Sequence, residues 1–206
     1  MIYIDSKKKS HKVNFFSSAF FIFDDVLNCD KLDKMVDSVK NELPNEARKS
    51  PDVSAGPTYE TNFFTKDSYT VDLTECVIAL NERLRDERCN VGLRENPWYA
   101  EYGPTDCHDP HLHCHFQYNI NSECDPKKWS YSSVINLSNI GSTNFFNPNY
   151  AGLSSPIKKF KSIRGRVILF PSNILHWAPP HRVDGQTRRI ISANFFLQYG
   201  EEWLCT

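Results

Sequence analysis

Two segments in the N-terminal half repeat their apolar residues at helical spacing. The first is Cys29–Leu43, which Pro44 follows, and its apolar residues share one helical face: Leu32, Met35, Val36 and Val39. The second starts near Asp72, with Thr70 or Asp72 as its N-cap, and frays near Cys89. Its expected apolar face is Val77, Ile78, Leu80 and Leu84. Apolar residues three or four apart predict an amphipathic helix in each segment.

From Trp98 onward the pattern changes to short apolar runs between turn residues, which is typical of strands. A further β-like segment, Val13–Phe23, precedes the helices. The predicted strands of the second half are Trp98–Tyr102, His111–Tyr118, Tyr131–Leu137, Thr143–Phe146, Val167–Phe170 and Arg188–Leu197. Two helices followed by a series of strands predict an α+β fold, with helices laid on an antiparallel sandwich or barrel.

Composition limits the classes of function. The chain has 206 residues, 40% of them hydrophobic and 24% charged, which suits one well-cored domain. A formal net charge of -1 argues against a strongly basic nucleic-acid-binding surface or a polybasic membrane-binding patch. The seven cysteines form no CxxC pair, and neither a signal peptide nor an apolar run of membrane-spanning length is recognised. We therefore expect a reduced, cytoplasmic setting.

Candidate chemistry begins in the segment CHDPHLHCHF, residues 107–116. Residues two apart on a strand share a face, so His111, His113 and His115 would project together. Imidazole is the commonest protein ligand for borderline metals, and two such rings can converge on one ion. The alternative is that they are ordinary polar strand residues, but three alternating histidines favour a metal site.

The C-terminal part supplies a third ligand and a cation. His176 follows an apolar strand and the Pro171-Ser172 turn, although His181 competes with it and a hydrogen-bonded core histidine is the alternative. Further on, Arg188 opens an apolar strand, on which it shares a face with Ile190, Ser192 and Asn194. An inward arginine is costly unless it meets an anion, either a carboxylate of the protein or a ligand.

The order of these motifs resembles the 2-oxoglutarate- and iron(II)-dependent dioxygenases, in particular the prolyl-hydroxylase-like and phage-type branch. The motifs are the His-x-His pair, the Gly141–Phe145 turn, and a Gly-x-x-x-x-Phe-Pro-Ser segment that precedes His176 and Arg188. The resemblance covers Trp98 to Leu197, about half of the chain.

The resemblance implies a double-stranded β-helix, or jelly-roll, at residues 98–197, with residues 1–97 as an N-terminal strand and supporting helices of the same single domain. It implies Fe(II) at His111, His113 and His176, and 2-oxoglutarate and O2 as cosubstrates. Arg188 would hold the cosubstrate, and the residues implied to assist are Asn136, Ser192 and Asn194. The implied reaction hydroxylates a small-molecule or peptide substrate, such as a peptidyl proline, and releases succinate and CO2.

The main departure from the family concerns the second ligand, because His113 stands where a carboxylate is usual. Asp106 or Asp109 is the alternative carboxylate. A three-His cupin-type dioxygenase that uses no 2-oxo acid, or a non-catalytic metal-binding module, remains a competing hypothesis. Substrate-pocket walls are predicted at Tyr131, Trp177 and Trp129, and the loop Asn119–Lys128 is a candidate lid; each has an ordinary core or surface role as its alternative.

Overall fold

The structure is a computed structural model, and its elements follow the expected order of helices and then strands. It describes residues 2–5, 10–15, 18–42, 59–60, 72–94, 97–113, 128–147 and 157–199. The helices are α1 (Cys29–Glu42) and α2 (Thr74–Leu84), with a 3-10 turn, Arg85–Glu87, after α2. The strands before residue 100 are β1 (Ile2–Asp5), β2 (Ser10–Phe15), β3 (Ser18–Phe23), β4 (Tyr59–Glu60), β5 (Cys89–Leu93) and the start of β6 (Trp98–Tyr102). The later strands are β7 (His108–His111), β8 (Lys128–Asn136), β9 (Ser142–Phe146), β10 (Ile157–Lys161), β11 (Val167–Pro171), β12 (His176–Ala178) and β13 (Arg188–Tyr199).

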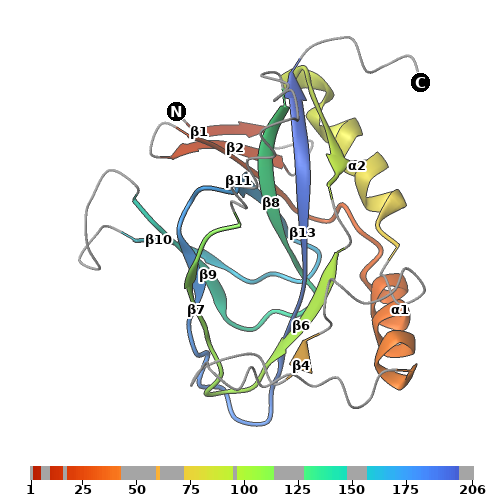
Figure 1. The fold of residues 1–206 in the computed structure, drawn as a ribbon, viewed down its shortest axis with the longest axis vertical. Helices are drawn as coiled ribbons and strands as arrows, with labels where there is room; N and C mark the ends of the chain where they lie inside the picture. Colours follow the sequence, from red (N-terminus) through yellow and green to blue (C-terminus); the bar gives the residue numbers. More distant parts are fainter. Residues whose placement is uncertain are drawn as a thin grey trace, which may run out of the picture.

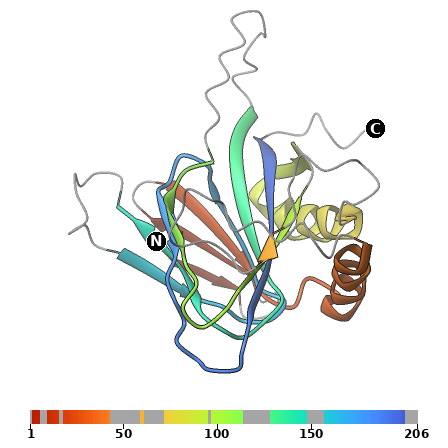
Figure 2. The same cartoon turned by 60° about the horizontal axis from the view of Figure 1, so that its bottom comes forward.

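These strands form two antiparallel sheets of a jelly-roll sandwich, as predicted. The larger sheet has the order β1-β2-β3-β11-β8-β13-β6-β4, and β5 pairs with the far half of β13. The smaller sheet has the order β10-β9-β12-β7. The helices lie on one side of the larger sheet and the smaller sheet lies on the other (Figures 1 and 2). The larger sheet therefore has two buried faces.

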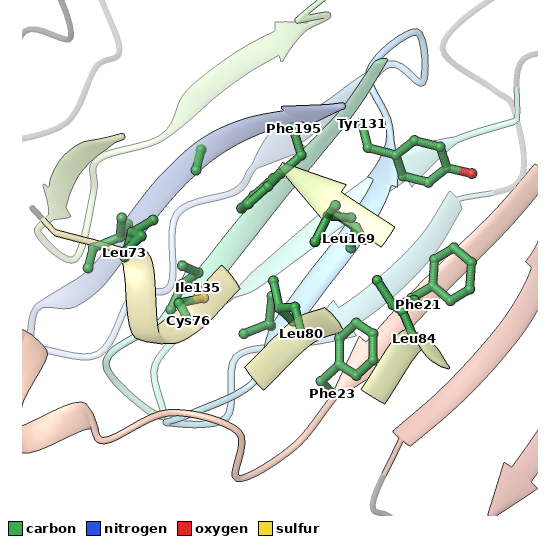
Figure 3. Packing of buried hydrophobic residues seen from close by; sticks show 14 of the residues in the cluster. Phe21, Phe23, Leu73, Cys76, Leu80, Leu84, Tyr131, Ile135, Leu169 and Phe195 are labelled. Carbon is green, nitrogen blue, oxygen red and sulfur yellow. The ribbon is translucent and has the colours of Figure 1, made fainter. Parts of the chain in front are cut away.

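Strand alternation divides the core into two layers. Ile135 of β8 and Leu137, which follows the strand, belong to the helix-side layer, while Val134 of β8 points between the two sheets. The helix-side layer joins Leu80 and Leu84 of α2 to residues of β3, β8, β11 and β13 (Figure 3). The layer between the sheets is rich in phenylalanine: its aromatic members Phe20, Phe145, Phe160 and Phe170 have ring centroids 4.8 to 6.3 Å apart.

Both predicted helices are confirmed, with two corrections. The N-cap of α2 is Leu73, without a side-chain cap hydrogen bond; the predicted Asp72 lies one residue earlier and accepts a hydrogen bond from the Thr74 N–H at 2.9 Å. Ile78, however, is 55% exposed, and Cys76 is buried in its place. The face of α2 is therefore set by a Cys76, Leu80 and Leu84 stripe, whose spacing of four residues follows the helical period.

Two strand predictions also change. The β-like segment Val13–Phe23 is a hairpin of two strands, β2 and β3. The strand predicted at His111–Tyr118 instead runs from His108 and ends at His111, and residues 114–127 lie outside the described ranges. Within the described ranges, no helix has the length and apolar character that crossing a bilayer requires.

Candidate metal centre

The smaller sheet brings two of the predicted ligands side by side. His176 of β12 lies opposite His111 of β7 in the antiparallel register. His113 follows two residues beyond the end of β7, where its backbone N–H donates to the Ser172 carbonyl at 3.1 Å. One ligand nitrogen from each of these three histidines lies within 4.8 Å of the others. Sequence spacing thus predicted the right group, although His113 is not part of the strand.

The Nδ1 atom of every one of these rings has a hydrogen-bond acceptor. His111 Nδ1 donates to the Asp109 carbonyl at 2.7 Å, and His176 Nδ1 donates to the Ile174 carbonyl at 3.0 Å. His113 Nδ1 lies 3.0 Å from Asn194 Oδ1. A carbonyl oxygen only accepts, so Nδ1 carries the proton and Nε2 keeps its lone pair. Such bonds are the usual way in which proteins orient metal-ligating histidines.

The donor set fits a divalent metal ion. His111 Nε2 and His113 Nε2 lie 3.1 Å apart, although the bonds at Nδ1 leave both as acceptors. Two acceptors at this distance repel each other unless a cation lies between them. Two nitrogen ligands at right angles, each about 2.1 Å from an ion, would lie about 3.0 Å apart. The spacing is therefore suited to neighbouring ligands of one ion.

Neither alternative aspartate joins this group. Asp106 Oδ2 accepts a hydrogen bond from the Gly103 N–H at 2.7 Å, within its own turn. Asp109 is exposed and contributes only its backbone carbonyl. In the part of the chain that the structure describes, the ligand group consists of imidazoles alone.

Burial favours the neutral, metal-binding form of His111 and His176. Burial lowers the pKa of His111 below its usual value. Burial, followed by the proximity of His111 and His113, lowers the pKa of His176 well below its usual range. His108 stacks on His111 with ring centroids 4.1 Å apart, and burial together with these neighbours lowers its pKa to about 3. Uncharged imidazoles with free lone pairs are ready to bind a cation.

Arg188 lines the same pocket as a buried cation, and it has no carboxylate partner among the described residues. It is 1% exposed, and its Nη2 donates to Thr143 Oγ1 at 2.9 Å. Its Nε and Nη1 are buried and have no hydrogen-bond partner among the described residues. Burial lowers its pKa, which the proximity of Tyr102 partly opposes. Buried guanidinium donors without acceptors are costly, so this arrangement points to a ligand.

The surrounding backbone leaves the arginine little room. A Cβ added at Gly141 would lie 2.9 Å from Arg188 Cδ, and Gly141 has a φ of +82°, which disfavours other residues. The Tyr102 ring lies on another side, with its centroid 5.4 Å from the guanidinium carbon. The Gly141–Phe145 turn therefore serves to hold Arg188.

The three histidines and Arg188 line one pocket. Further walls are Tyr102, His108, Thr143, Trp177 and Ser192. Among the described residues, no Asp or Glu lines it. A pocket with neutral imidazoles, one arginine and no acid is suited to an anionic ligand.

The remaining predicted residues are divided between the pocket and other places. Ser192 and Trp177 line it, whereas Asn194 contacts His113. Asn136 is not part of its lining: its Nδ2 donates to the Arg166 carbonyl at 3.0 Å. Tyr131 is corrected, because strand alternation places it in the helix-side core, 6.2 Å from Phe21 between ring centroids.

Two other predictions lie outside the described residues. These are the Trp129 side chain and most of the Asn119–Lys128 loop.

Sequence reasoning gave no role to several residues that shape this site. Thr143 belonged to a recognised turn, but its bond to Arg188 was not foreseen. His108 stood in the histidine-rich segment, and Tyr102 Oη lies 3.1 Å from its Nδ1. Its place in the histidine-rich segment CHDPHLHCHF could have indicated His108. The predicted strand began at His111, so His108 was left outside it.

Comparison with known proteins gives the fold a context. No family model matches the chain, and no curated protein sequence does. Solved structures do match. A prolyl-4-hydroxylase from Pseudomonas putida is 15% identical, with 91% of this chain and 96% of that chain covered and a TM-score of 0.52. The chain shares its fold.

Two further structures agree. The non-heme alpha ketoglutarate dependent carbocyclase SnoK from nogalamycin biosynthesis is 8% identical, covers 96% of this chain and 87% of that chain, and has a TM-score of 0.60. The viral collagen prolyl hydroxylase vCPH from Paramecium Bursaria Chlorella virus-1, solved as a 2OG complex, is 18% identical, with 87% and 96% covered and a TM-score of 0.50. At these identities the likeness shows the fold, and it confirms the predicted jelly-roll.

Proposed function

We propose that this protein is an iron(II)- and 2-oxoglutarate-dependent oxygenase on a single jelly-roll domain. His111, His113 and His176 would hold the metal, and Arg188 would bind the far carboxylate of 2-oxoglutarate. The proposed reaction hydroxylates a small-molecule or peptide substrate and releases succinate and CO2. The matched structures, two prolyl hydroxylases and an alpha ketoglutarate dependent carbocyclase, support this class.

The observation that carries the proposal is the buried guanidinium of Arg188 in the same pocket as the three histidines. A site that bound a metal alone would gain nothing from a buried, unmatched cation nearby. A dicarboxylate with a 2-oxo acid group meets both needs, because one end chelates a metal and the other accepts two hydrogen bonds from arginine. Nε–H and Nη1–H of Arg188 point to opposite edges of the guanidinium, so one carboxylate would take one of them together with the Nη2 hydrogen that Thr143 does not use.

The protein's own residues orient and enclose the reactants. Iron(II), when bound, supplies O2 activation coupled to the oxidative decarboxylation of the 2-oxo acid. Thr143 binds Nη2 of Arg188, which fixes the orientation of the guanidinium beside the pocket. The rings of Phe145 and Phe170, with centroids 5.7 and 4.7 Å from that of His176, exclude water from the inner side of the site.

A second candidate rests on the all-imidazole ligand group. A three-His dioxygenase of the cupin type would use the same metal ligands without a 2-oxo acid. The two functions differ in what Arg188 does. In the first, it binds the cosubstrate; in the second, succinate is never formed and the substrate itself supplies the anion.

Anaerobic titration with iron(II) and then 2-oxoglutarate tests the proposal. We expect a weak visible charge-transfer band on addition of the 2-oxo acid, and slow succinate formation when air is admitted. His176→Ala should abolish the band. Arg188→Ala should keep iron binding but lose succinate formation, because only the cosubstrate anchor is removed.

His181→Ala is the matched control, since His181 lies outside the ligand group and its Nε2 bonds the Tyr102 carbonyl at 3.1 Å. It should retain both the band and the turnover. Wild-type protein without measurable affinity for divalent metals would contradict the proposal. Metal binding with oxygen uptake but no succinate would favour the three-His candidate instead.

A further inference from the structure

A chain of buried polar side chains leads from the surface to His113, in the position where a carboxylate ligand is usual. Arg94 Nη1 donates to Ser130 Oγ at 3.1 Å, and Ser130 Oγ donates to Ser172 Oγ at 3.0 Å. Ser172 Oγ lies 2.8 Å from Ser132 Oγ, which donates to Asn194 Oδ1 at 2.7 Å. Asn194 Oδ1 lies 3.0 Å from His113 Nδ1. We call Ser130, Ser172, Ser132 and Asn194 the serine–asparagine relay.

The relay is built into the layer between the two sheets. Ser132 and Ser172 are fully buried, and Asn194 is 3% exposed. Ser132 shares its face of β8 with Val134, an apolar member of that layer. Buried hydroxyl and amide groups cost free energy unless they are bonded. Each group of the relay is hydrogen-bonded to the next, and Asn194 at its inner end contacts the candidate metal ligand His113.

Ser172 is tied to His113 a second time through the backbone. Its carbonyl accepts the His113 N–H at 3.1 Å, and its own N–H donates to the Ser130 carbonyl at 3.0 Å. The Phe-Pro-Ser segment therefore fixes both the backbone of His113 and, through Ser132 and Asn194, its ring. Displacing Ser172 would move the ligand directly.

The direction of the hydrogen bonds decides what His113 can do. Arginine only donates, so Arg94 leaves the Ser130 hydrogen to point inward, and each hydroxyl passes its hydrogen on toward Asn194. Asn194 Oδ1 then accepts from Ser132 and also from His113 Nδ1. Were the amide reversed, its NH2 group would donate to Nδ1, and Nε2 would carry the proton and be unable to bind a metal.

We propose that Asn194, oriented by Ser132 and Ser172, is the positioning residue that fixes the metal-binding tautomer of His113. The inference rests on the proposed metal site and extends it. It also gives Asn194 a task different from contact with the cosubstrate. His113 and Asn194 are both neutral, so this ligand does not offset the positive charge of the metal ion. A carboxylate ligand in place of His113 would offset part of it.

Iron(II) affinity tests the proposal, measured anaerobically by competition with a fluorescent chelator. Asn194→Leu removes the acceptor and should weaken iron(II) binding by about 10- to 100-fold. Asn194→Asp keeps an acceptor at that place, so it should retain the affinity or tighten it. Ser132→Ala, which leaves Asn194 in place but removes one donor to it, should weaken binding several-fold. The visible absorption of Co(II)-loaded Asn194→Asp should differ from that of wild type, because a carboxylate makes the imidazole a stronger donor.

Ser133→Ala is the matched control: Ser133 is buried on the neighbouring position of β8, where its hydroxyl contacts the Ala193 carbonyl at 3.4 Å. It should bind iron(II) as wild type does. Equal affinities for wild type, Asn194→Leu and Ser132→Ala would overturn the inference while leaving the metal site intact.

The histidine tautomer gives a readout that needs no metal. In ¹⁵N-labelled protein, long-range ¹H–¹⁵N spectra should show His113 protonated at Nδ1, and Ser132→Ala should increase the fraction protonated at Nε2. A wild-type His113 protonated at Nε2 would overturn the inference. Wild type with the expected tautomer but without metal affinity would contradict the proposed function and leave the positioning role of Asn194 standing.

Discussion

Arg188 and Arg189 are consecutive residues of β13, yet they face opposite layers of the molecule. Arg189 points to the helix side, where it forms 3.0 Å ion pairs with Asp33 and Asp37 of α1 and donates to Tyr99 Oη at 2.6 Å. Arg188 points between the sheets and meets Thr143 and the Tyr102 ring. One arginine is matched by protein carboxylates; the other has none among the described residues.

A second arginine on the helix side is also matched by carboxylates. Arg164 pairs with Asp30 and Asp33 of α1 at 2.7 and 2.6 Å. Burial opposes the charge of Arg189, but the Tyr99 bond and nearby acids raise its pKa, whereas burial lowers the pKa of Arg188. Arg164 and Arg189 therefore fasten α1 to the sheet. Arg188, between the sheets, has no carboxylate partner among the described residues.

The largest expected effect is stabilisation by the cosubstrate. With iron(II) present and air excluded, 2-oxoglutarate at a hundred times its Kd should raise the free energy of unfolding of wild type by about 2.7 kcal/mol. Arg188→Met should lose this stabilisation, because the anion has lost its donor. Urea unfolding with and without the ligand measures both. Equal stabilisation of the two proteins would show that Arg188 is not the anion site.

The second effect concerns the matched arginine. Arg189→Met should lower the free energy of unfolding by about 2 kcal/mol, since it breaks a partly buried network and leaves Asp33 without one of its cations. The 2-oxoglutarate-dependent stabilisation should persist. Urea unfolding, with exposed Arg182→Met as control, measures the loss. A change below that of the control would mean that the ion pairs with α1 contribute nothing to stability.

The sequence predicted the alternation of β13 well, because a period of two follows directly from strand geometry. It also predicted His111, His113 and His176, since their side chains carry recognisable chemistry even though the strand boundary was misplaced. It failed for Tyr131 and did not foresee the contacts of Asn194, for a different reason. Their roles depend on which residue of another strand faces them: Phe21 for the first, Ser132 and His113 for the second. The local sequence pattern does not predict the register between strands that are distant in the chain.

The smallest effect has the opposite sign. In the absence of metal and cosubstrate, Arg188→Met should raise the free energy of unfolding by about 1 kcal/mol, because an apolar chain of similar length replaces a buried charge that no described carboxylate neutralises. The lost hydrogen bond to Thr143 and the lost contact with the Tyr102 ring reduce the gain but do not reverse it. Urea unfolding of the two unliganded proteins at neutral pH gives the value. A stabilised but inactive variant would mean that the protein keeps Arg188 at the expense of stability in order to bind a ligand. A loss of stability as large as that of Arg189→Met would instead mean that Arg188 has a structural partner, and the contrast between the two faces of β13 would disappear.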